Sequence, residues 1–428
     1  MQNRLNRKIA PPLQALQELK LRQPEQLRLD NNVPVYLWNM GTQEVVMIRL
    51  VFQAGRWHEH HKLSAEFTAR MLREGTQNLN AKQLHDRIEY HGATLKSSAN
   101  KDYSNITLYT LTKHLPYLLP LLKEVLMEAS FPEKELQTIV QNSKQKLLVN
   151  LEQNEYMAHR RFNRAIFGNQ HPYGYNVQTS DYDEINVTML QEFHKDFYVS
   201  NNCQIYIAGK VSERELTLVN RYLGTMTWEK GVIEAAPLHI IPPYEAKQHY
   251  FSKKGSVQAA ISIGKPLFNK THTDYPAFYV LNTLFGGFFG SRLMSNIREE
   301  KGLTYGIYSS NVSFLRAGYW SITTEVAEDA WEQTLKEIFF EMNRLKNTLV
   351  EEKELTLVKS YLMGNLLSSI DGAFSLAGAF EGMQLYGLNL DYFNRLISTI
   401  EQITPNDIQV LAQKYFDQHE LTQVIVGK

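Results

Sequence analysis

The stretch ITPNDIQVLAQKYFDQHELTQVIVGK, residues 403–428, has the same pattern as the internal stretch INVTMLQEFHKDFYVSNNCQIYIAGK, residues 185–210. Each residue of the later stretch follows its counterpart by 218 residues, as Ile403 follows Ile185, so the two align without a gap. Both have the spacing of an amphipathic helix followed by an apolar strand. The repeat predicts that one unit of helices and strands occurs twice in the chain.

Looser matches extend this repeat to other parts of the chain. The strand-like run VVMIRLVFQAG at 45–55 parallels VQAAISIG at 257–264, and the helix-like run HDRIEYHG at 85–92 parallels MSNIREEKG at 294–302. The two helical runs end in glycine, the residue that a left-handed helix C-terminus favours. Offsets near half of the 428-residue length indicate a duplication, because the units of a solenoid are much shorter.

The order of the expected elements indicates the fold class. Strands such as ITLYTL at 106–111 and YWSITTEV at 319–326 cluster between helices without a regular alternation. We therefore expect an α+β fold of two duplicated domains, each a mostly antiparallel sheet with helices packed on one face. Prolines in PLHIIPPYEAKQ break both periodicities, which predicts a linker at 229–248 between domains at 1–228 and 249–428.

Composition excludes several classes of function. Lys and Arg number 45 and Asp and Glu number 45, so no global positive field favours a nucleic-acid partner. The single cysteine, Cys203, excludes an internal disulfide framework. Because we find no signal-peptide core and no apolar span of membrane length, we expect no membrane partner and a cytoplasmic location.

The stretch HEHHKLSAEFTARMLREGT at 58–76 combines histidines with a helical run whose apolar residues repeat along one face. Alternate residues of an extended loop point in opposite directions, and no acid or histidine is supplied opposite His58 and His60. We therefore expect the histidines to form a solvated loop and not a metal site. A self-sufficient metallopeptidase that uses HEHH ranks last among the functions considered.

Four motifs resemble the pitrilysin/insulinase family of zinc peptidases, in the two-domain branch related to bacterial processing proteases and mitochondrial processing peptidase. They are the AGRWHE loop before the helix, HGA at 91–93, HPYGY at 171–175 and GSRLMSNIREEKGLTYGIYS at 290–309. The resemblance covers nearly the whole chain. It implies the inverted zinc motif H-x-x-E-H, in which two histidines hold zinc and the glutamate activates water.

By this resemblance, the motif positions are Glu66, Ala69 and Arg70. Ala69 cannot accept a proton, Arg70 offers no lone pair, and one carboxylate is too little for a tetrahedral site. The family's third ligand would fall in KQKLLVN at 144–150, which contains no acid; Glu152 is the nearest candidate. We expect no metal in this chain, and an i,i+4 ion pair between Glu66 and Arg70 in the vacated site.

The second half retains the other part of the family's machinery. NIREEKGLTY at 296–305 resembles I-R-E-x-x-G-L-x-Y, in which the arginine and tyrosine bind the substrate carbonyl and the developing oxyanion. The corresponding residues are Arg298, in the last turn of a helix that ends at Gly302, and Tyr305, at the start of a strand. From the residues alone, Arg298 could instead complement the helix dipole, and Tyr305 could simply pack.

The resemblance implies a non-catalytic subunit of a heterodimeric zinc peptidase, inactive alone. Arg298 and Tyr305 would serve a homologous partner chain that holds zinc in an intact H-x-x-E-H motif. The substrate would be an extended peptide bound along a sheet edge. One alternative is a structural, proteolytically inactive subunit of a larger complex, and another is the self-sufficient metallopeptidase.

Overall fold

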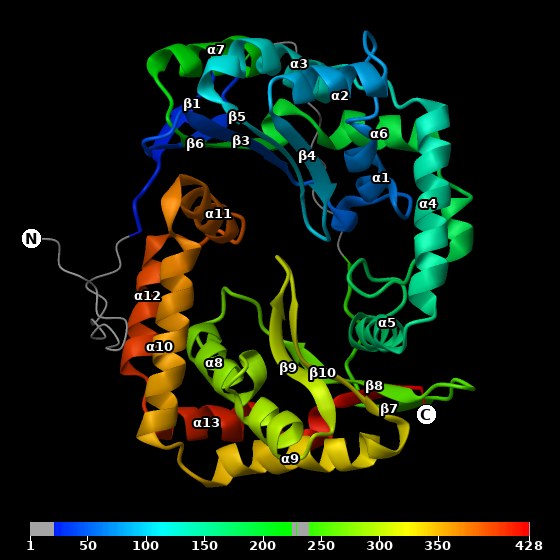
Figure 1. Cartoon of the computed structure of the whole chain (residues 1–428), viewed down its shortest axis with the longest axis vertical. Helices are drawn as coiled ribbons and strands as arrows, with labels where there is room; N and C mark the ends of the chain where they lie inside the picture. Colours follow the sequence, from blue (N-terminus) through cyan, green and yellow to red (C-terminus); the bar gives the residue numbers. More distant parts are fainter. Residues whose placement is uncertain (1–20, 225–227, 229–238, 428) are drawn as a thin grey trace, which may run out of the picture.

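The computed structural model describes residues 21–224, 228 and 239–427, which form two β-sheets with helices around them (Figure 1). The first sheet contains β1 (Glu25–Arg28), β2 (Pro34–Asn39), β3 (Val45–Phe52), β4 (Thr94–Ala99), β5 (Ser104–Leu111) and β6 (Cys203–Gly209). The second contains β7 (Gln248–Phe251), β8 (Gln258–Leu267), β9 (Thr304–Ser313), β10 (Gly318–Ala327) and β11 (Thr422–Val426).

The α-helices of the first half are α1 (Ser64–Met71), α2 (Ala81–Tyr90), α3 (Leu115–Met127), α4 (Glu133–Leu151), α5 (Asn154–Phe167), α6 (Val187–Phe197) and α7 (Glu213–Leu223). Those of the second half are α8 (Tyr275–Asn282), α9 (Trp331–Asn347), α10 (Glu352–Ser369), α11 (Gly372–Gln384), α12 (Leu390–Gln402) and α13 (Pro405–Tyr415). Two shorter segments matter for the site: the 3₁₀ helix η1 (Arg56–His58) and the π-helix η6 (Met294–Glu300). In the described part of the chain, no helix is long and apolar enough to cross a membrane.

The two sheets have the same topology. The first has the strand order β1-β2-β6-β3-β5-β4, and the second has β7-β11-β8-β10-β9, which matches the last five positions of the first. In each sheet the first strand of the shared order pairs in parallel with the last strand along the chain, β2 with β6 and β7 with β11. The other neighbouring pairs are antiparallel. The predicted α+β class and the mostly antiparallel sheets are confirmed, and the shared strand order confirms the duplication.

Equivalent glycines have equivalent conformations in the two halves. Gly92 and Gly302 have φ angles of 60° and 63°, the left-handed geometry that their positions after a helix predict. The end of β6 also requires a glycine, Gly209, because a Cβ atom there would lie 2.1 Å from the carbonyl oxygen of Val45. The last of the equivalent glycines, Gly427, would bring a Cβ atom to 2.3 Å from the carbonyl oxygen of Gln258. The duplicated stretches therefore share their backbone requirements as well as their pattern.

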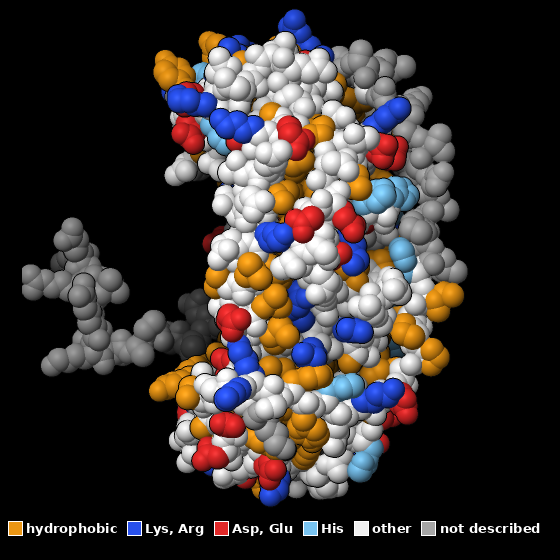
Figure 2. Space-filling view, turned by 90° about the vertical axis from the view of Figure 1, so that its right-hand side faces the viewer, with side chains coloured by type: hydrophobic (Ala, Val, Ile, Leu, Met, Phe, Trp, Pro, Cys, Tyr) orange, Lys and Arg blue, Asp and Glu red, His pale blue; other side chains and the backbone are white. Residues whose placement is uncertain are grey.

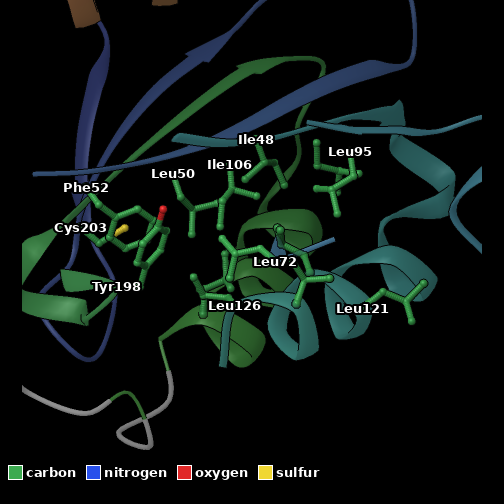
Figure 3. Close-up of a cluster of buried hydrophobic side chains, with 14 of the residues drawn as sticks. Ile48, Leu50, Phe52, Leu72, Leu95, Ile106, Leu121, Leu126, Tyr198 and Cys203 are labelled. Atoms are coloured by element: carbon green, nitrogen blue, oxygen red, sulfur yellow. The ribbon is translucent and has the colours of Figure 1, made fainter. Parts of the chain in front are cut away.

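One face of the first sheet packs on its own helices through an aliphatic core (Figure 3). Ile48, Leu50 and Ile106 project from the strands toward Leu72 and Leu126 on the helix side (Figure 3). Each fully buried side chain of this kind contributes roughly 1.5–3 kcal/mol. The second sheet packs in the same way on α8, α9, α10 and α13.

The opposite face of each sheet is covered by a helix of the other half. From the first half, α5 places Phe162 against Tyr319 of the second sheet, with ring centroids 5.6 Å apart. From the second half, α11 places Phe380 against Tyr36 and Trp38 of the first sheet, at 5.2 and 5.3 Å. Figure 1 shows both helices between the sheets, on opposite sides of the molecule. This exchange of α5 and α11 ties the two halves into one structure.

The predicted division of the chain concerns the segment between the two sheets. Residues 229–238 of the predicted linker 229–248 lie outside the described residues. The described remainder has no helix or strand until β7 begins at Gln248. The boundaries 1–228 and 249–428 stay a prediction.

Candidate functional site

The motif positions Glu66, Ala69 and Arg70 lie on α1, beside a pocket of about 610 Å³. Glu66 and Arg70 line this pocket, whereas Ala69 is fully buried and is not among the lining residues. The Arg70 guanidinium lies 3.5 Å from the Glu66 carboxylate, so the predicted ion pair is present. Arg70 Nη1 also donates a hydrogen bond of 2.7 Å to Ser143 Oγ on α4, which holds the guanidinium against the pocket wall.

The window in which the third metal ligand was expected lies on α4, across the pocket from α1. Lys146 and Asn150 from this window line the pocket. Glu152, the nearest acid, follows the end of α4 outside the pocket, and its carboxylate pairs with Lys253 Nζ at 3.2 Å. Among the residues that the structure describes, no group of three His, Cys, Asp or Glu side chains could hold a metal ion. These side chains do not fit zinc, which requires at least three protein ligands.

The HEHH stretch is placed differently from our expectation. His58 ends η1 and is only 3% exposed, with its ring 5.3 Å from that of Phe197. Burial lowers the pKa of His58 to about 4, with smaller contributions from Arg316 and neighbouring histidines. The prediction of a solvated loop is wrong for His58, because the backbone curls into a 3₁₀ turn that directs the ring inward, whereas His60 is exposed as expected.

Glu59 has a role that the sequence did not reveal. Its carboxylate accepts hydrogen bonds from the amide of Ala65, at 3.1 Å, and from the hydroxyl of Tyr175, at 2.5 Å. It thereby caps α1, whose N-cap residue Leu63 has no side-chain acceptor. Burial raises the pKa of Glu59 to about 7 against the opposing effect of Arg56. Local patterns give no signal for this contact, because 116 residues separate Glu59 from Tyr175.

Arg298 and Tyr305 lie side by side in the second half. Arg298 is on η6, Gly302 follows it, and Tyr305 is the second residue of β9, in the predicted order. Arg298 Nε donates a hydrogen bond of 3.0 Å to the carbonyl oxygen of Tyr305, and its guanidinium lies 4.5 Å from the centre of the Phe289 ring. Both side chains line an open pocket of about 730 Å³, and Tyr305 is 95% exposed.

The structure does not bring the two sets of predicted residues into one site. Glu66 and Arg70 line a pocket between α1, α4 and α5, whereas Arg298 and Tyr305 line a pocket at the start of β9. The two pockets have no lining residue in common. Arg298 and Tyr305 therefore belong to a different pocket from the one beside the chain's own degenerate motif.

Comparisons with known proteins identify relatives of the chain. Residues 35–175 match the family described as Insulinase (Peptidase family M16), and residues 184–362 match the one described as Peptidase M16 inactive domain. The chain is 25% identical over 349 residues to "Uncharacterized zinc protease YmxG" of Bacillus subtilis, covering 81% of this chain and 84% of that protein. It is 24% identical over 411 residues to "Non-peptidase homolog YmxG" of Helicobacter pylori, covering 92% of each.

The fold is shared with solved structures. A crystal structure described as the peptidase M16 inactive domain from Pseudomonas fluorescens matches with a TM-score of 0.85 at 22% identity, covering 94% of this chain and 98% of that chain. The chain therefore belongs to the pitrilysin/insulinase family, M16, as its motifs indicated.

Proposed function

We propose that this chain is the non-catalytic subunit of a heterodimeric zinc peptidase. It supplies Arg298 and Tyr305 to a homologous partner that holds zinc in an intact H-x-x-E-H motif. The observation that carries the proposal is the pairing of a 95% exposed Tyr305 with Arg298 in a chain whose own motif positions cannot seat a metal. The relatives named as a zinc protease and as a non-peptidase homologue support a family in which zinc chemistry is lost in some members.

The Arg298 and Tyr305 side chains suit the stabilisation of a developing oxyanion. The bond from Arg298 Nε to the backbone of Tyr305 fixes the guanidinium, and Nη1 lies 3.9 Å from a carboxylate oxygen of Glu299. Donors that are fixed before the reaction stabilise charge without reorganisation. In the proposed assembly the partner's zinc supplies the activated water, and this chain supplies hydrogen-bond donors to the carbonyl oxygen of the substrate.

An extended peptide is the substrate class that fits the sheet edges. The first sheet ends in β4 and the second in β9, so each offers an edge strand to a further strand. Tyr305 is the second residue of β9. A peptide paired with this edge would pass next to the Arg298 and Tyr305 side chains.

Exposed apolar side chains around these two residues support a partner surface. Phe289 is 59% exposed, Val257 81% and Tyr308 52%. Val257 lines the same pocket as Tyr305, and Phe289 underlies the Arg298 guanidinium. Exposed apolar groups that gather in one place are typical of an interaction site.

The test is to mix the full chain with a homologous chain that has an intact H-x-x-E-H motif and to measure peptide hydrolysis. We expect hydrolysis by the mixture and by neither chain alone, and a loss of rate with Tyr305→Phe or Arg298→Ala. Tyr90→Phe is the matched control, because Tyr90 is 86% exposed on α2 in the first half. If Arg298→Ala and Tyr305→Phe leave hydrolysis unchanged, the chain is a structural subunit instead.

A further inference from the structure

The pocket beside the degenerate motif has a strong excess of positive charge. Its lining includes five cationic side chains, each from a different element: Arg56 of η1, Arg70 of α1, Lys101 of the β4–β5 turn, Lys146 of α4 and Arg160 of α5. Glu66 is the one carboxylate among the residues that line it. Because the chain as a whole has 45 basic and 45 acidic residues, this excess is local. Figure 2 shows several Lys and Arg side chains at mid-height of the face that carries α4 and α5.

Most of these cations are held by neutral groups. The Arg56 guanidinium lies 4.4 Å from the centre of the Tyr175 ring, and Arg160 Nη2 donates a hydrogen bond of 2.7 Å to the carbonyl oxygen of Val177. Lys101 Nζ donates one of 3.1 Å to the carbonyl oxygen of Tyr173. These contacts orient the side chains without neutralising them.

Two of the five cations have a carboxylate nearby: Arg70 pairs with Glu66 at 3.5 Å, and Asp102 follows Lys101 in the chain. The carboxylate of Asp102, next to Lys101 in the chain, accepts a hydrogen bond from the Tyr173 hydroxyl and lies 3.7 Å from Arg316. Burial, with repulsion from Arg56, lowers the pKa of Lys101 to about 7. A group of five cations with a single carboxylate among the residues that line the same pocket favours an anionic ligand.

The distribution of the charges indicates the kind of anion. A compact phosphate site typically draws its donors together at one helix N-terminus or one loop. Here the cations come from five elements around the wall of a 610 Å³ pocket, with the amides of Asn142, Asn150, Asn163 and Asn176 between them. This spread suits a ligand that carries several separate carboxylates.

We propose that this pocket binds an acidic segment of a peptide, with its carboxylates on Arg70, Lys146 and the neighbouring cations. The position that holds a metal cation in the zinc peptidases of the family has become, in this chain, a position for anions. This inference rests on the proposed function only because it takes a peptide as the ligand. It specifies that the substrate peptide contains acidic residues.

The test uses the full chain without a partner and a fluorescein-labelled peptide in which Asp alternates with Gly. The control ligand has Asn in place of every Asp. By fluorescence anisotropy at low ionic strength, we expect the Asp peptide to bind, the Asn peptide not to bind, and added NaCl to weaken binding. Equal binding of the two peptides overturns the proposal.

Charge-reversal variants place the ligand in the pocket. Lys146→Glu should raise the dissociation constant about tenfold or more, since like charges across a contact are repulsive. Lys336→Glu on α9, also exposed, makes the same change in net charge and should leave the constant within about twofold. Lys146→Gln should give an intermediate loss. An unchanged constant in both Lys146 variants overturns the proposal.

Inorganic phosphate separates a small-anion site from a peptide site. At matched ionic strength, phosphate should displace the Asp peptide no better than chloride does, and strong displacement assigns the pocket to small anions and overturns the peptide proposal. Failure here is distinguishable from failure of the proposed function. If a mixed assembly hydrolyses peptides but this chain does not prefer acidic ones, only the acidic-peptide proposal fails. If the chain binds the acidic peptide but no mixture hydrolyses peptides, the heterodimer proposal fails instead.

Discussion

The guanidinium of Arg49 on β3 and the carboxylate of Glu381 on α11 form an ion pair of 2.7 Å between the two halves of the chain. Their side chains are 24% and 7% exposed, so solvent screens the pair only in part. Arg49 Nε also donates a hydrogen bond of 3.0 Å to Thr107 Oγ1, which fixes its direction. The pair therefore sets the rotation of α11 on the first sheet.

Removing one partner of this ion pair should destabilise both halves. Glu381→Ala leaves the Arg49 guanidinium largely buried without its carboxylate, and we expect the free energy of unfolding to fall by about 2–4 kcal/mol. Urea denaturation measures the change. Asp86→Ala, which breaks the exposed pair with Lys82, is the control and should cost much less, because solvent screens that pair. Equal losses in the two variants would show that the ion pair between the halves stabilises the fold no more than an exposed pair does.

The exchanged helices should make the two halves unfold together. Phe162→Ala on α5 and Phe380→Ala on α11 each remove a large buried side chain that packs on the other half's sheet, at a cost of about 3–5 kcal/mol. Hydrogen exchange read separately on β3 and β10 should show the same loss of protection in either variant. Loss confined to the half that carries the substitution would contradict this coupling.

The exchange of helices also shows where sequence reasoning ends. The repeat between 185–210 and 403–428 predicted the duplication, because its helix, strand and glycine positions are local features. The apolar faces of α5 and α11 are local features too, but they do not say which sheet each helix covers. That choice depends on the path of the chain between the halves.

The site shows the same division between local and distant information. The Glu66–Arg70 ion pair was predictable, because i,i+4 neighbours on a helix meet whatever surrounds them. The cap that Glu59 provides to α1 and its contact with Tyr175 were not, since the partners come together only in the fold. Nor could spacing alone reveal that Lys146 faces the same pocket as Arg70.

The carboxyl group of Glu59 should make stability depend on pH. Its pKa is raised from 4.5 to about 7 in the folded chain, so the folded state holds this proton more tightly than the unfolded state does. The stability that follows from this is full below the unfolded pKa and is lost as the pH rises through about 7. Between pH values of about 4 and 8, we expect the wild type to lose at most about 3 kcal/mol relative to Glu59→Gln, whose side chain remains uncharged.

Denaturant titrations of the two proteins over this pH range measure the difference. The glutamine amide can still accept from Ala65 and can donate to the Tyr175 hydroxyl, so the α1 cap is kept. Parallel profiles for wild type and Glu59→Gln would contradict the assignment of the effect to this carboxyl.

The hydroxyl of Tyr305 should affect the rate of the proposed assembly more than substrate binding. Donors to an oxyanion act mainly in the transition state, so Tyr305→Phe should lower kcat by about 10²-fold with little change in KM. Steady-state kinetics of the mixed chains measure both constants. A rise in KM at constant kcat would instead make Tyr305 a binding residue for the ground-state peptide.

Restoring the ligand set should return metal binding without returning hydrolysis. Glu66→His and Arg70→His place two imidazoles on one face of α1, and Lys146→Glu adds a carboxylate from α4, which together make the three protein ligands of a catalytic zinc site. Metal analysis after dialysis should find stoichiometric zinc in this triple variant, less in the variant that keeps Lys146, and none in the wild type. Because Ala69 remains and cannot act as a base, the isolated triple variant should not hydrolyse peptides.

The triple variant should also no longer bind the acidic peptide, because two of the pocket's cations are gone. Stoichiometric zinc in the wild type would instead mean that Glu66 and residues outside α1 hold the metal. That result would contradict the proposal that this pocket binds anions.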